Sequence, residues 1–84
     1  MDIHEIDLNK QAATLISDRF AFDVEFEVRF FKDGNGFQSW NDVEIESIKL
    51  IQAGDENGQV DHNLSSDEET QIIETLEEHI RGLI

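Results

Sequence analysis

The chain has 84 residues, of which 20 are Asp or Glu and 6 are Lys or Arg, so its formal net charge at pH 7 is −14. This length fits a single domain over residues 1–84, and the lack of Cys excludes disulfides, thiolate zinc sites and iron–sulfur clusters. Because a strongly negative chain repels phosphate, we expect no direct binding to nucleic acid or to a membrane. With no signal-like start and no membrane-length apolar run, the sequence predicts a cytoplasmic protein.

The apolar residues near the N-terminus allow more than one structure. Residues 3–8 suit a short strand, whereas Asn9 suits the cap of a short helix over residues 10–17 that would bury Ala12, Leu15 and Ile16. We expect a short strand followed by one or two helical turns in this region.

The stretch 22–31 predicts a half-buried antiparallel strand. Its aromatic and β-branched residues fall at every second position, namely Phe22, Val24, Phe26, Val28 and Phe30. Charged residues occupy the positions between them, so one face is apolar and the other is polar. Turn residues at 32–36 end the strand.

A second strand is predicted over residues 43–51, but its alternation changes phase. Val43 and Ile45 share one parity and Ile48 and Leu50 share the other, so we expect a β-bulge near residues 46–47 that brings all four to one face. A turn follows at 54–58, and residues 59–61 suit a short edge segment.

The C-terminal stretch predicts an amphipathic helix over about 67–81. Either Ser65 with Glu68 or Ser66 with Glu69 fits a capping box, in which side chains satisfy the free N–H groups at the helix start. The apolar stripe at helical spacing comprises Ile72, Ile73, Leu76, Ile80 and Leu83.

These elements predict an α+β fold in which the hairpin 22–31/43–51 packs on the C-terminal helix, with a third N-terminal or edge strand left open. The outer face of the sheet would display Glu25, Glu27, Glu44 and Glu46 beside Arg29 and Lys49. The outer face of the helix would display Glu74, Glu77 and Glu78. We expect carboxylates to dominate both surfaces.

Metal-binding patterns are weak in this sequence. His4, His62 and His79 lie in three different predicted elements, so they do not indicate a zinc site. The oxygen-bearing residues at 55–61 resemble the start of a calcium loop, but the required Gly and the twelfth-position Glu are missing. We expect no metal and no cofactor.

Catalytic patterns are also weak. The chain has no Cys nucleophile and no serine in a G-x-S-x-G elbow. Glu25 and Glu44 could be neighbours across the predicted strands, but a pair of carboxylates without a pocket is a solvated surface. An enzyme is therefore not expected.

From Phe22 onward the order of elements resembles a group of small acidic proteins of tailed bacteriophages. The resemblance rests on the alternating strand, a strand like residues 42–50, a glycine turn, a segment like residues 60–65 and an acidic terminal helix. It covers residues 22–84 and brings no activity with it. It implies a phage or prophage origin and expression in the host cytoplasm.

These features favour a protein-binding module that engages a basic host or phage protein, as a mimic of DNA in the extreme case. Phe31, Phe37 and Trp40 are candidate anchors for a partner, although Phe37 and Trp40 could instead fold back over the end of the sheet. The alternatives are a toxin-neutralising immunity protein and an accessory phage protein whose acidity only keeps it soluble. A monomer and a homodimer are both compatible with the sequence.

Overall fold

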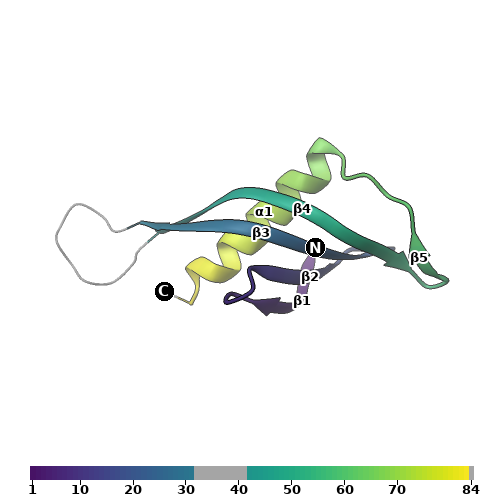
Figure 1. The fold of residues 1–84 in the computed structure, drawn as a ribbon, viewed down its shortest axis with the longest axis horizontal. Coiled ribbons are helices and arrows are strands. Elements are labelled where there is room, and N and C mark those ends of the chain that lie inside the picture. The colour runs from purple at the N-terminus through teal and green to yellow at the C-terminus, as the bar shows by residue number, and fades with distance from the viewer. Residues whose placement is uncertain (32–41, 84) are drawn as a thin grey trace.

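One antiparallel sheet and one helix make up the fold of this protein, seen here in a computed structural model that describes residues 1–31 and 42–83 (Figure 1). In chain order the elements are β1 (Asp2–Asp7), β2 (Ala12–Ile16), β3 (Ala21–Phe31), β4 (Asp42–Asp55), β5 (Gly58–Val60) and α1 (Ser66–Arg81). The strands are hydrogen-bonded in the order β1-β2-β3-β4-β5, and every neighbouring pair is antiparallel. The predicted α+β architecture is confirmed, including both the N-terminal strand and the short edge strand.

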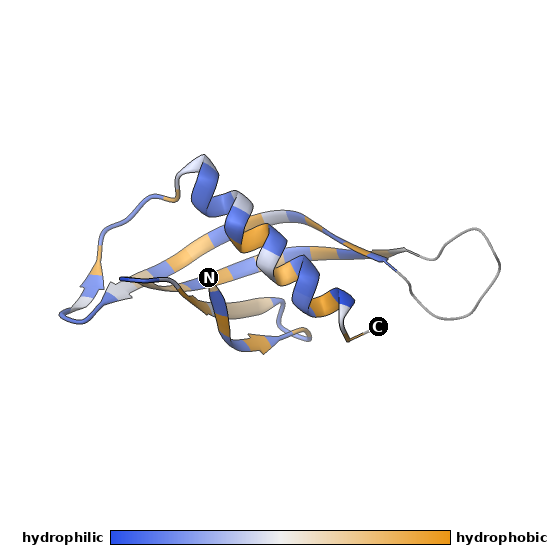
Figure 2. Cartoon of the chain, turned by 180° about the vertical axis from the view of Figure 1, so that it is seen from behind, coloured by the Kyte–Doolittle hydropathy of each residue, from blue (hydrophilic) through white to orange (hydrophobic). Residues whose placement is uncertain are grey.

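The hairpin of β3 and β4 is the longest part of the sheet. Hydrophobic and hydrophilic residues alternate along both strands (Figure 2), and Phe22, Val24 and Phe26 are buried on one face as the period of two predicts. β4 continues four residues beyond its predicted end at Ile51, because it pairs with the start of β3 on one side and with β5 on the other.

Bulges keep most of the large apolar residues of the sheet on one face. The predicted bulge in β4 is confirmed: Val28 pairs with Ile45 and Glu27 pairs with Ser47, so Glu46 is the extra residue. A second shift leaves Ile51 without a partner, and a third leaves His4 without one in β1. Each extra residue shifts the in/out alternation of the side chains by one position. In a regular strand without a bulge, the apolar residues that follow would point to the opposite face.

The N-terminal helix predicted over residues 10–17 is wrong, because Ala12–Ile16 form strand β2. Asn9 does not cap a helix but lies in the turn between β1 and β2, where the Asp7 carboxylate accepts hydrogen bonds from the backbone N–H groups of Asn9 and Lys10. β2 pairs with the free edge of β3 and buries Ala13 and Leu15. Pairing with β3 therefore overrides the weak local preference for helix.

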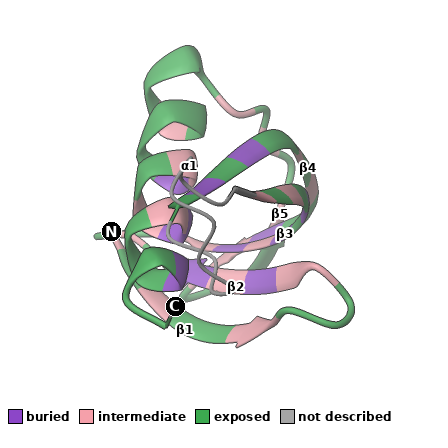
Figure 3. Ribbon diagram, turned by 90° about the vertical axis from the view of Figure 1, so that its left-hand side faces the viewer, coloured by how far each residue is buried: buried purple, intermediate pink, exposed green. Residues whose placement is uncertain are grey.

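Helix α1 covers the apolar face of the sheet and closes the core. Ser65 and Glu68 form the capping box at its start, so the first of the two predicted pairs is the correct one. Ile72, Leu76 and Ile80 are fully buried in the core. The buried segments of α1 lie on the side of the helix that faces the sheet (Figure 3). Leu83 is 60% exposed, contrary to the prediction that it joins the core, because the helix ends at Arg81.

Candidate functional site

Carboxylates collect on the sheet face that points away from α1. The pairing register places Asp7, Ala12, Glu25 and Lys49 in one row across four strands, and cross-strand partners share a face. We call seven of the outward carboxylates the acidic face: Glu5, Asp7, Asp23, Glu25, Glu27, Glu44 and Glu46. Asp2, opposite Ile16 at the end of β1, is not counted because it lines a hollow with Thr75 and Glu78 of α1. The four residues predicted for the outer sheet face all belong to the acidic face, and all four are exposed.

Basic residues interrupt the acidic face. Glu25 lies opposite Lys49 and Glu44 lies opposite Arg29, so the predicted neighbourhood of Glu25 and Glu44 is wrong. The Arg29 Nη1 atom also lies 3.6 Å from Glu46 Oε1 in a solvent-exposed ion pair. Counting Lys10, Arg29 and Lys49, seven acids against three bases leave this face with a net charge of −4. Exposed pairs of this kind contribute little to folding, about 0–1 kcal/mol each.

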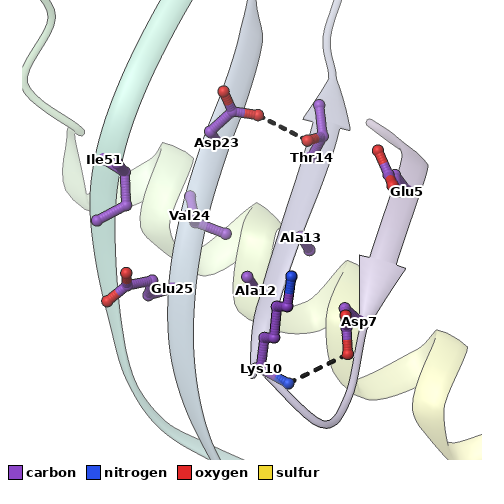
Figure 4. A pocket seen from close by; sticks show the side chains of 10 residues that line it. All are labelled: Glu5, Asp7, Lys10, Ala12, Ala13, Thr14, Asp23, Val24, Glu25 and Ile51. Atoms are coloured by element: carbon purple, nitrogen blue, oxygen red, sulfur yellow. Dashed lines mark hydrogen bonds between the residues drawn. The ribbon is translucent and has the colours of Figure 1, made fainter.

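An open groove of about 310 Å³ crosses the acidic face over β1 to β4. Figure 4 shows the side chains that line it, which are Glu5, Asp7, Lys10, Ala12, Ala13, Thr14, Asp23, Val24, Glu25 and Ile51. The short side chains of Ala12, Ala13 and Thr14 in β2 form the bottom of the groove. The Thr14 hydroxyl donates a 2.6 Å hydrogen bond to Asp23. Ile51, the extra residue of the second β4 bulge, is 50% exposed and adds an apolar wall. The groove therefore combines negative charge with a small apolar surface.

The carboxylates of α1 do not form one uniform surface. Glu74 and Glu78 are exposed as predicted, whereas Glu77 is half-buried. Its Oε2 atom accepts a 2.9 Å hydrogen bond from the backbone N–H of Ile45 in β4. Glu77 is thus bound to the edge of the sheet.

Asp42 and Arg81 make a related set of contacts at the start of β4. Asp42 Oδ1 accepts hydrogen bonds from the Val43 backbone N–H at 2.7 Å and from Arg81 Nε at 2.9 Å. The Val43 N–H bond and then the Arg81 guanidinium hold the pKa of Asp42 below its ordinary value. This carboxylate is also committed to contacts within the fold.

A third carboxylate, Glu68, belongs to a cluster that sequence reasoning missed. His62 Nε2 lies 2.9 Å from Glu68 Oε2, and the imidazole stacks on Phe20 with ring centroids 5.2 Å apart. Hydrogen bonding from the Ser65 backbone N–H, followed by that from His62, lowers the pKa of Glu68 from its ordinary 4.5. The capping-box pattern indicated the Ser65–Glu68 part, but no spacing rule pointed to His62.

The aromatic residues predicted as anchors for a partner are not part of the described site. Phe37 and Trp40 lie outside the described residues, as does the side chain of Phe31. Within residues 1–31 and 42–83, no group of three or more His, Asp or Glu side chains is arranged to hold a metal ion.

Comparison with known proteins adds no relative: no protein-family model, no curated protein and no solved structure matches this chain. In the part of the chain that the structure describes, no helix has the length and apolar character needed to cross a membrane.

Proposed function

We propose that this chain is a non-enzymatic protein-binding module whose acidic face engages a basic surface of a partner protein in the cytoplasm. One observation carries the proposal: the pairing register collects seven carboxylates on the sheet face that α1 leaves open.

The sheet makes the acidic face a rigid array. Side chains on one face of a strand recur about every 6.7 Å, and neighbouring strands lie about 4.8 Å apart. Because the sheet fixes the backbone positions of these carboxylates, no backbone segment has to become ordered when they bind, and their summed field speeds the approach of a basic partner.

The charge density of the acidic face favours binding to a basic patch on a protein over full mimicry of DNA. Duplex DNA carries one negative charge per about 1.7 Å of its axis. The acidic face carries less charge per unit length, because seven acids and three bases leave a net −4 along strands of 11 and 14 residues. We infer that the partner surface carries separated Lys or Arg side chains, and that the groove beside Ile51 accepts the aliphatic stem of one such residue.

A matched pair of variants tests the proposal. Glu25→Gln/Glu27→Gln changes the acidic face, whereas Glu74→Gln/Glu78→Gln removes the same charge from the exposed side of α1. Both variants and the wild type are immobilised and exposed to lysate of the cell that makes the protein, and retained proteins are identified by mass spectrometry. The dissociation constant of a retained basic protein is then measured with purified material.

We expect the acidic-face variant to bind about tenfold more weakly, which corresponds to ~0.7 kcal/mol for each of two charge contacts. The helix variant should bind as the wild type does. Binding should also weaken as NaCl rises from about 0.1 M to 1 M, because the screening length falls from about 10 Å to 3 Å. Loss of binding in the helix variant alone would move the site to α1. Retention of no basic protein would favour an accessory protein whose acidity maintains solubility.

A further inference from the structure

The edge of β4 that faces away from β3 has a strand partner over only a small part of its length. Among the described residues, β5 pairs with Ala53–Asp55, and no strand pairs with this edge nearer the start of β4. A strand edge with free N–H and C=O groups is a template for another strand. β4 has 14 residues without proline, so this edge is long enough to add one.

Side chains occupy the backbone groups at the start of this edge. Val43 and Ile45 are two residues apart and therefore present their backbone groups to the same side of the strand. The Val43 N–H donates to Asp42 Oδ1, and the Val43 carbonyl accepts from Arg81 Nη2 at 3.3 Å. The Ile45 N–H donates to Glu77 Oε2. Three polar groups that an added strand would use are already bound.

The helix supplies two of these side chains from one face. Glu77 and Arg81 are four residues apart, a spacing that places them side by side on α1. The same turns bury Leu76 and Ile80 in the core. The packing of α1 on the sheet thus fixes an acceptor and a donor against the edge of β4.

We propose that Glu77 and Arg81 block the edge of β4 against strand addition by a second copy of this chain and so keep the protein monomeric. The occupant that they exclude is β4 of that second copy. Antiparallel pairing of two identical edges is related by a two-fold axis and therefore forms a closed dimer. The added strand would take the hydrogen bonds of Val43 and Ile45 that α1 and Asp42 now provide.

The test uses two double variants that keep the formal charge at −14. Glu77→Ala/Arg81→Ala removes one acid and one base from the blocked edge. Glu74→Ala/Arg19→Ala removes one acid and one base from exposed positions elsewhere. Sedimentation equilibrium is measured over a concentration series in about 0.5 M NaCl, where repulsion between the negative chains is screened. Circular dichroism confirms that each variant is folded.

We expect the wild type and Glu74→Ala/Arg19→Ala to keep the monomer mass, and the mass of Glu77→Ala/Arg81→Ala to rise toward twice that value. In the associated form, the Ile45 amide should be protected from hydrogen exchange. A folded Glu77→Ala/Arg81→Ala that stays monomeric at every concentration would overturn the proposal, as would association that leaves this amide unprotected. Equal association of both double variants would also overturn it.

A second measurement applies if the double variant does not fold. In the single variant Glu77→Ala, hydrogen exchange at the Ile45 amide should become faster, whereas Glu77→Gln keeps an acceptor oxygen and should match the wild type. Unchanged exchange in Glu77→Ala would contradict the blocking role of Glu77.

Discussion

The carboxylates of the acidic face and those that connect α1 to the rest of the fold have the same chemistry but different surroundings. On the acidic face, Glu25 and Glu27 are exposed and lie opposite Lys49 and Ser47. At the helix, Glu68 and Glu77 each accept a hydrogen bond from a backbone N–H group. The acidic side chains therefore belong to two groups: exposed carboxylates that a partner can reach, and carboxylates that are hydrogen-bonded within the fold.

The difference has a structural origin. An acidic side chain on the open face of the sheet has water on one side, and its strongest neighbours are exposed cations. A side chain on α1 beside the sheet meets backbone donors that would otherwise be left unpaired near the core. The two regions should therefore respond differently to the same kind of substitution.

The largest difference in the free energy of unfolding should appear when apolar residues of the two regions are replaced. Leu76 is fully buried beneath α1, so Leu76→Ala should lower the free energy of unfolding by about 2–5 kcal/mol through lost burial and a residual cavity. Ile51 is 50% exposed at the groove, and Ile51→Ala should cost less than about 1 kcal/mol. Urea denaturation measures both. Similar losses in the two variants would mean that the acidic face is as important to folding as the core.

A smaller difference should separate the glutamates of α1. Glu77→Ala leaves the Ile45 N–H without its acceptor beside a buried side chain, and should cost about 1–3 kcal/mol. The exposed Glu74 provides the control, since Glu74→Ala should change stability by no more than about 0.5 kcal/mol. Both values come from chemical denaturation of monomeric protein at low concentration. An effect of Glu74→Ala as large as that of Glu77→Ala would contradict the distinction.

The smallest effect should be a change in pH dependence caused by Glu68. Because its pKa is lower in the folded chain, Glu68 stabilises the fold fully above its ordinary 4.5 and loses that contribution as the pH falls through its lowered folded value. Glu68→Gln keeps a capping-box side chain but does not titrate. Stability measured from neutral pH downward should therefore fall less steeply in Glu68→Gln than in the wild type. Parallel curves would show that the Glu68 carboxylate is not stabilised by folding. Glu25→Gln removes one carboxylate from the acidic face and serves as the control.

The strongest local patterns predicted the corresponding parts of the fold. The alternation in β3 and the helical stripe of α1 each place large apolar residues on a single face, so few other structures can bury them. The phase change in β4 also predicted a bulge near residues 46–47, where Glu46 is the extra residue. The region 12–16 was misjudged because a five-residue strand of small and aliphatic residues has the same composition as a short helix.

The candidate site was predicted less completely than the fold. Glu25, Glu27, Glu44 and Glu46 were placed on the correct face because strand alternation assigns faces directly. The contribution of β1 to the acidic face was missed, since it depends on the β1–β2 pairing and on the bulge at His4. The contact between His62 and Glu68 was missed because the position of His62 depends on its stacking on Phe20, which lies 42 residues earlier in the chain.

By itself, the sequence determined the elements that a local pattern specifies. They are the alternating strand β3, the bulge that returns the apolar residues of β4 to one face, and the capped amphipathic helix. Only the tertiary structure decided which carboxylates stay available. The hydrogen bond from Ile45 to Glu77 joins residues 32 positions apart, and it forms because helix packing brings an acceptor to an open strand edge. Such contacts depend on how elements meet, which no periodicity along the chain encodes.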